Sequence, residues 1–136
     1  QHVLGYCRND ILFHDFEFDE KLVKVNSDVA VWQKIKELKS EGKKIVIYSP
    51  TFRNAKEYSV KREEVDFDLL EEFGRENNIV FVFKLHPLPK NNVDMSCYQN
   101  IIEYNSKCDI YPLFSISDMM ITDYSSIYLD YILLYY

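Results

Sequence analysis

The chain contains little glycine, only three residues in 136. Phosphate-binding loops usually depend on several closely spaced glycines, so a phosphate site in this protein must be built from other residues. An excess of positive charge is also missing, because 16 Lys and Arg stand against 22 Asp and Glu, a net charge of −6. This balance argues against nucleic acid as a partner. Small anionic substrates stay open, since local fields and helix ends decide their binding.

Long apolar runs and a regular cysteine pattern are lacking as well. The apolar stretches are far shorter than the roughly 20 residues that span a membrane, and the first ten residues have no signal-peptide pattern. Cys7, Cys97 and Cys108 are odd in number and lack metal-ligand spacing. We therefore expect reduced thiols and a cytoplasmic protein. The chain begins on a strand-like segment and stops inside an apolar helical pattern, so we expect a piece of a longer protein.

Strand and helix patterns alternate along the chain. Four apolar segments predict strands, at residues 43–50, 78–87, 100–104 and 118–122. Helical patterns cover residues 28–41, 66–77, 111–117 and 124 to the end. Strands that are apolar on both faces are typical of parallel strands buried between helices. The alternation therefore predicts an α/β fold, a Rossmann-like parallel sheet with flanking helices.

Four residues mark helix ends in these patterns. Ser27 is a candidate N-cap of the first helix, and Gly42 is placed to end it. Asp109 is a candidate cap of the short helix at 111–117, with Pro112 in its first turn.

Polar residues follow three of the predicted strands. Thr51 and Arg53 come after the first strand, His86 after the second, and residues 122–126 (TDYSS) after the fourth. Ligands of an open parallel sheet gather outside the carboxyl ends of its strands, so these side chains should converge. A guanidinium, an imidazole and a hydroxyl-rich helix start together suit a phosphate or pyrophosphate.

Each candidate also has a plainer interpretation. Ser125 and Ser126 can donate to phosphate beside the free N–H groups of the helix start, yet Asp123 or Ser125 could simply cap that helix for about 1 kcal/mol. Asp130, one turn further along the helix, could accept from ribose hydroxyls or be a solvated helix residue. His86 could protonate a leaving phosphate or be structural. Arg53 could be an ordinary surface arginine.

Four ordered motifs carry a family resemblance: GYCRNDIL (5–12), IVIYSPTFR (45–53), FKLHPL (83–88) and SISDMMITDYSSIYLDYILL (115–134). Together they resemble the CDP-glycerol glycerophosphotransferase family, whose members build teichoic acids and related capsular polymers. The family patterns read roughly G-x-P-R-N-D, A-P-T-F-R, K-x-H-P and S-D-x-x-I-T-D-Y-S-S. Cys7 stands in place of the usual Pro, Ser49 of Ala, and Leu129 of Phe. None of these exchanges removes a chemical group.

The resemblance implies a GT-B architecture, two Rossmann-like domains that face a cleft. Residues 1–136 would form a single, incomplete donor-nucleotide-binding domain, the truncated C-terminal half of the GT-B fold, and the acceptor-side domain would be absent. It also implies that His86 is catalytic and that Ser125 and Ser126 bind the donor phosphates. Asp130 falls where related enzymes place the acidic ribose contact. We add four further candidates for donor binding, which lie in the same motifs: Arg8, Thr51, Thr122 and Asp123, beside Arg53.

The implied reaction transfers glycerol phosphate, or ribitol phosphate, from a CDP-activated donor to a lipid-linked teichoic-acid-like or capsular polymer, with release of CMP. No cofactor or metal is expected. The parent protein would be peripheral on the inner face of the cell membrane, oligomerisation stays open, and the isolated fragment should be inactive. Two alternatives remain: a GT-B glycosyltransferase or epimerase that uses a UDP-sugar, and a non-catalytic nucleotide-binding module.

Overall fold

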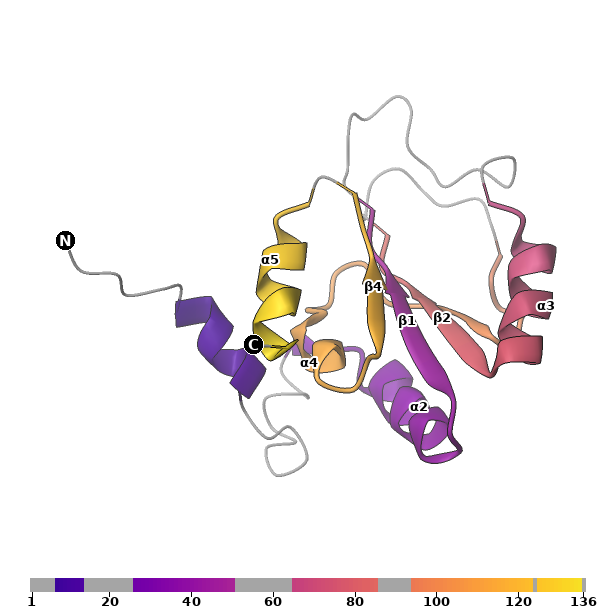
Figure 1. Ribbon diagram of the computed structural model, residues 1–136, viewed down its shortest axis with the longest axis horizontal. Coiled ribbons are helices and arrows are strands. Elements are labelled where there is room, and N and C mark those ends of the chain that lie inside the picture. Colours follow the sequence, from indigo (N-terminus) through magenta and orange to yellow (C-terminus); the bar gives the residue numbers. More distant parts are fainter. Residues whose placement is uncertain (1–6, 14–25, 51–64, 86–93, 124, 136) are drawn as a thin grey trace.

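The computed structural model describes residues 7–13, 26–50, 65–85, 94–123 and 125–135 (Figure 1). The helices and strands, in chain order, are the 3-10 helix η1 (Cys7–Phe13), α2 (Val29–Ser40), β1 (Lys44–Tyr48), α3 (Phe67–Asn77), β2 (Ile79–Phe83), β3 (Ile101–Glu103), α4 (Tyr111–Phe114), β4 (Met119–Ile121), α5 (Ile127–Ile132) and the 3-10 helix η2 (Leu133–Tyr135).

The four strands form one parallel sheet in the order β3-β2-β1-β4. Ile45 of β1 pairs with Val80 of β2, Ile47 of β1 pairs with Met120 of β4, and β2 pairs with β3 in the same direction. The predicted α/β fold with a parallel sheet is therefore confirmed. Because every strand points the same way, all four carboxyl ends lie along one side of the sheet, the carboxyl edge. The carboxyl ends of β1 and β4 are at the top of Figure 1.

Side chains of the strands alternate between two apolar clusters, one on each face of the sheet. One face carries strand residues at alternate positions (Ile45, Ile47, Val80, Val82, Ile102) and packs against Trp32 and Ile35 of α2, Leu113 and Phe114 of α4, and Tyr131 of α5. The opposite face carries Val46, Phe81, Phe83 and Ile101, which pack against Phe67 of α3. Helices thus cover both faces of the sheet, which explains why β1 and β2 read as continuous apolar runs.

The edge strand β4 departs from this pattern. Met120 packs against the core, but Met119 is 54 % exposed and Ile121 is 43 % exposed. The apolar run at 118–122 predicted burial on both faces, and that expectation is wrong for this strand. The reason is that β4 is the outermost strand of the sheet, next to β1 alone, and the cluster around α3 does not extend to Met119 or Ile121.

The helix ends follow the predicted chemistry in part. Gly42 ends α2 with a φ of +86°, as expected, but the N-cap is Asp28, whose carboxylate accepts from the Val31 amide at 3.2 Å. The Ser27 prediction was wrong by one residue. Asp109 accepts from the Tyr111 amide at 3.1 Å, but the N-cap of α4 is Ile110, so the Asp109 prediction was also wrong by one residue. Pro112 lies in the first turn as predicted, and α4 ends at Phe114 rather than 117.

The first described segment is a helix. Residues 7–13 form the 3-10 helix η1, and Leu12 packs into the cluster that contains α2 and α4. The strand-like opening begins in residues 1–6, which lie outside the described residues, so that expectation stays a prediction.

Candidate functional site

The turns after β1 and β4 are joined at the carboxyl edge of the sheet. The Ser49 amide donates to the Ile121 carbonyl at 2.9 Å, and the Thr122 hydroxyl donates to the Ser49 carbonyl at 2.5 Å. Ser49 is buried. These two bonds extend the pairing of neighbouring parallel strands past their ends. They fix the start of the TDYSS segment beside the chain that leads from β1 to residue 51.

The start of α5 presents both serines of that segment. Ser125 Oγ accepts from the Ile127 amide at 3.4 Å, a long capping bond, while Ser126 is the N-cap residue and its side chain makes no capping bond. Ser126 is exposed and Ser125 is half-buried. The plainer interpretation, that Ser125 caps the helix, is supported by this side-chain bond, although Ser126 occupies the N-cap position. A hydroxyl at the mouth of a helix can donate to an anion.

Asp130 lies deeper on the same helix and is only 4 % exposed. Its Oδ2 accepts from the Tyr111 hydroxyl at 2.6 Å, which ties α5 to α4. The interpretation of Asp130 as a solvated helix residue is wrong, since the residue faces the interior. Its proposed ribose contact stays a prediction, and the carboxylate would have to serve a ligand while bonded to Tyr111.

A second set of hydroxyls fastens α5 to the segment before β4. Ser117 Oγ donates to the Phe114 carbonyl at 3.0 Å and lies 3.1 Å from the Tyr131 hydroxyl, which in turn is 2.9 Å from the hydroxyl of Tyr135. Burial raises the pKa of Tyr131 above its usual range, so this hydroxyl stays protonated. The network holds α5 in place, so the direction of its N-terminus is set by packing as well as by the TDYSS turn.

Several predicted site residues lie outside the described part of the chain. Thr51, Arg53 and His86 belong to this group, and Arg8 is described only as backbone within η1. Asp123 is described and exposed. Of the predicted site, the structure thus places the segment that contains Thr122, Ser125 and Ser126, and it brings that segment to the turn that precedes residue 51.

The ends of β2 and β3, on the other side of β1 from β4, have contacts that the sequence did not indicate. The Lys84 ammonium donates to the carbonyls of Asn105, Ser106 and Cys108, all in the segment between β3 and α4. The Tyr104 hydroxyl accepts from the Asp28 amide at 3.0 Å and donates to the Asp109 carbonyl at 2.6 Å. Burial raises the pKa of Tyr104 to about 12. The only signal in the sequence was the lysine of the K-x-H-P motif, whose partners no residue pattern reveals.

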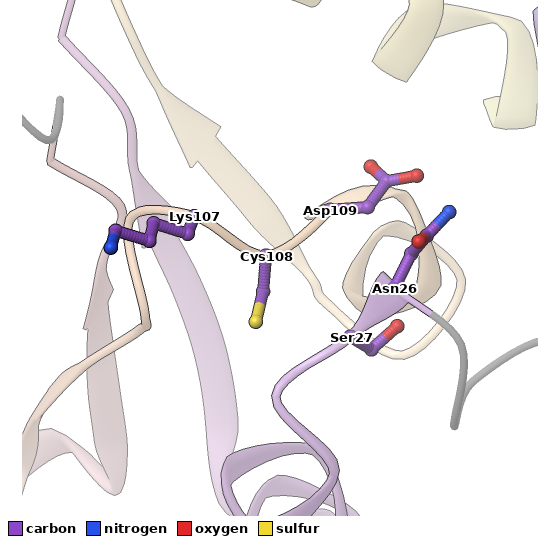
Figure 2. A pocket seen from close by; sticks show the side chains of 5 residues that line it. All are labelled: Asn26, Ser27, Lys107, Cys108 and Asp109. Carbon is purple, nitrogen blue, oxygen red and sulfur yellow. The ribbon is translucent and has the colours of Figure 1, made fainter.

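A polar pocket of about 370 Å³ adjoins this segment. Its lining comes from two segments far apart in the chain, Asn26 and Ser27 before α2 and residues 107–109 before α4. Figure 2 shows Lys107 and Asp109 directed to opposite sides of Cys108 along the loop. The Asp109 amide donates to the Asn26 carbonyl at 2.7 Å, so the two walls are bonded to each other.

Among residues 7–13, 26–50, 65–85, 94–123 and 125–135, no group of three or more His, Cys, Asp or Glu is placed to hold a metal ion. None of the helices in these ranges is both long enough and apolar enough to cross a bilayer.

The fold and the polar edge together define a class, an α/β domain with a Rossmann-like parallel sheet and joined turns at its carboxyl ends. The family is shown by comparison with known proteins. The family model of CDP-Glycerol:Poly(glycerophosphate) glycerophosphotransferase matches residues 1–135, and the chain belongs to this family.

Relatives and solved structures agree with that assignment. The teichoic acid poly(glycerol phosphate) polymerase of Staphylococcus epidermidis is 34 % identical over 134 residues, which cover 94 % of this chain and 17 % of that protein. The structure of the wall teichoic acid polymerase TagF, as a histidine variant, superposes with a TM-score of 0.64 at 29 % identity, over 96 % of this chain and 31 % of that one.

A second TagF structure, of another histidine variant soaked with CDPG, gives a TM-score of 0.61 at 29 % identity, over 98 % of this chain and 31 % of that one. The chain therefore spans less than a third of the length of each of these proteins, and its fold is that of part of a GT-B-like polymerase.

Proposed function

We propose that the protein containing this chain transfers glycerol phosphate from CDP-glycerol to a lipid-linked teichoic-acid-like or capsular polymer and releases CMP. In this proposal residues 1–136 are the donor-nucleotide-binding part of a GT-B transferase. Membership of the glycerophosphotransferase family and the likeness to a TagF structure soaked with CDPG support it. Ribitol phosphate is the alternative transferred group. The lipid-linked acceptor would place the parent protein at the inner face of the membrane.

The proposed reaction is a phosphoryl transfer that forms one P–O bond and breaks another. An acceptor hydroxyl attacks the β-phosphorus of the donor, a new P–O bond forms, and the bridging P–O bond breaks. The bridging oxygen leaves with the electron pair as part of CMP, and the hydroxyl proton passes to a base. Negative charge moves onto the leaving phosphate, so catalysis depends on donors and cations already placed there.

Residues at the carboxyl edge would supply this stabilisation. His86 would protonate the leaving phosphate or hold its charge, and Arg53 would clamp it with a bidentate guanidinium. Ser125 and Ser126 would donate to the phosphates at the start of α5. The remaining proposed donor contacts are Arg8, Thr51, Thr122, Asp123 and the ribose contact Asp130.

One observation carries the structural side of this proposal. The Thr122–Ser49 bond holds Thr122, the first residue of the TDYSS motif, beside Ser49, which directly follows β1 and precedes the candidates Thr51 and Arg53 in the chain. Two motifs 73 residues apart in the chain are thus joined at the edge where parallel sheets bind ligands. This arrangement supports a shared anion site built without glycine-rich loops.

His86→Ala in the full-length protein tests the mechanism. We expect kcat with CDP-glycerol to fall by about 10²- to 10⁴-fold, the usual contribution of an acid–base group, with little change in melting temperature. Lys34→Met, an exposed change on α2, is the control and should keep full activity. A near-normal rate in His86→Ala would remove His86 from the mechanism. Turnover of UDP-sugars in place of CDP-glycerol would overturn the proposed donor.

A further inference from the structure

Lys84 makes an unusual set of contacts for a lysine in a phosphate-transfer motif. Its ammonium lies 2.9 Å from the Asn105 carbonyl oxygen, 2.9 Å from that of Ser106 and 2.5 Å from that of Cys108. A protonated lysine has three N–H donors. Three donors therefore meet three backbone acceptors of a single segment, residues 105–110, which we name the β3–α4 loop.

The β3–α4 loop needs a cation at its centre. Its carbonyls at 105, 106 and 108 point inward to one spot, and converging carbonyl dipoles repel one another unless a positive charge lies between them. Lys84 supplies this charge, and its ammonium also lies 5.3 Å from the centre of the Tyr104 ring. Burial lowers the pKa of Lys84, while the charges of Cys108, Asp109 and Asp28 act to raise it.

Tyr104 fastens the same loop from the other side. Its hydroxyl bridges the Asp28 amide and the Asp109 carbonyl, and the Asp109 amide donates to the Asn26 carbonyl. The loop is thereby fixed to the start of α2. Together the two segments line the polar pocket of Figure 2.

Lys84, which holds the β3–α4 loop, also lies close in the chain to the proposed site. Lys84 directly follows β2, and its amide donates to the Tyr48 carbonyl at 2.9 Å, so it sits at the carboxyl edge between the ends of β1 and β3. It precedes His86 by two residues. The β3–α4 loop lies at the same edge, because it follows the carboxyl end of β3.

We propose that Lys84 is a positioning residue for donor binding: it holds the β3–α4 loop and its pocket at the donor edge, and it does not contact the donor phosphates. A lysine in such a motif would ordinarily be taken for a phosphate contact. Here its three donors already have backbone acceptors. The inference rests on the proposed function, since it takes CDP-glycerol as the ligand of the edge.

Lys84→Met and Lys84→Arg in the full-length protein, with Lys34→Met as the matched control, test this inference. Lys34 is exposed on α2, and its replacement changes the net charge by the same amount. For Lys84→Met we expect KM for CDP-glycerol to rise at least about tenfold while kcat changes less than about threefold, the pattern of lost binding rather than lost transition-state contact. Lys84→Arg keeps the charge and several donors and should recover part of the affinity.

Amide hydrogen exchange separates positioning from direct contact. In Lys84→Met the amides of Cys108 and Asp109, bonded to Asn105 and Asn26, should exchange at least about tenfold faster. In Lys34→Met they should not change. A fall in kcat with unchanged exchange in the loop would overturn the inference in favour of a phosphate contact. If Lys84→Met does not fold, Lys84→Arg decides the question. If the charge positions the loop, the amides of Cys108 and Asp109 in Lys84→Arg must exchange less than about tenfold faster than in the wild type.

The outcome for the proposed function can be read separately. If the wild-type protein does not bind or turn over CDP-glycerol, the proposed function fails, while the exchange data still show whether Lys84 holds the loop. If the wild type is active and Lys84→Met has normal KM, the role of Lys84 in donor binding fails and the proposed function stands.

Discussion

The two ends of the carboxyl edge are held in different ways. At the β2–β3 end, one ammonium and one phenol bind backbone groups, and the bonded segments line an open polar pocket. At the β4–α5 end, the support comes from hydroxyls on α4, α5 and the neighbouring turns, as in the bonds of Thr122 to Ser49 and of Tyr111 to Asp130. The side chain of Ser126 takes no part in these bonds as a cap, and it is exposed.

This difference distinguishes side chains that support the backbone from side chains that we propose bind the donor. Lys84 and Tyr104 use their polar atoms on the backbone, so they stabilise a loop rather than present donors to a ligand. At the β4–α5 end the supporting bonds are made by Asp130 and Tyr131 further along α5, whereas Ser126 at the helix start is exposed and makes no capping bond. We therefore expect changes at the first end to act on stability and loop order, and changes at the second to act more on donor binding.

Tyr104→Phe should give the largest loss of stability. It leaves the Asp28 amide and the Asp109 carbonyl without their buried partner, and each unpaired group costs about 1–3 kcal/mol, so we expect a total loss of about 2–6 kcal/mol. Urea unfolding of the full-length protein measures it, with Tyr128→Phe, an exposed tyrosine on α5, as control. Equal stability of the two variants would show that the Tyr104 bonds do not fix the loop.

The pH dependence of the stability difference between the wild type and Tyr104→Phe gives a second test of the Tyr104 bonds. The pKa of Tyr104 is raised to about 12 by burial, so its stabilisation is fully present below pH 10 and is lost as pH rises from 10 to 12. Burial of Lys84 acts in the opposite direction, since its lowered pKa makes stability rise with pH up to 10.5. The stability difference between wild type and Tyr104→Phe should hold below pH 10 and shrink above it. A constant difference to pH 12 would contradict the buried environment of Tyr104.

Tyr111→Phe should have a smaller effect at the other end. It removes the donor to buried Asp130 and should cost about 2 kcal/mol, the value of a hydrogen bond to a charged group. If Asp130 also contacts ribose, Asp130→Asn should weaken CDP-glycerol binding more than Tyr111→Phe does, although both disturb the same bond. Equal weakening in calorimetric titrations would assign Asp130 a purely structural role.

Thr122→Val should be the mildest change in stability. It removes one hydrogen bond to Ser49 and should cost about 1 kcal/mol. Its effect on donor affinity should exceed this, because the bond joins the two turns of the proposed anion site. A variant with lower stability and unchanged affinity for CDP-glycerol would show that the joining of the turns does not matter for the donor.

Much of the fold could be predicted from the sequence because its determinants are local. Apolar runs bounded by turn residues located all four strands, and Gly42 marked a helix end. The cap of α2 was displaced by one residue because Ser27 and Asp28 are adjacent and both can accept from the helix start. The exposure of Met119 and Ile121 could not be foreseen, since it depends on strand order, which is a non-local property.

The site was predictable only in part, for a related reason. The rule that ligands bind at the carboxyl edge pointed to the TDYSS turn, and the structure places this turn beside the end of β1. The contacts of Lys84 were not predictable, because its acceptors are backbone carbonyls 21 to 24 residues away that any residue types would carry. The burial of Asp130 follows from the packing of α5 on α4, which no spacing in the chain reveals.

Calorimetric titration of CDP-glycerol into the full-length protein and its Ser125→Ala/Ser126→Ala variant tests the central claim most directly. The claim is that the start of α5 binds the donor phosphates. We expect the double variant to bind at least about tenfold more weakly, a loss of about 1.4 kcal/mol or more, while its melting temperature stays close to that of the wild type. Unchanged affinity in a folded double variant would contradict the account.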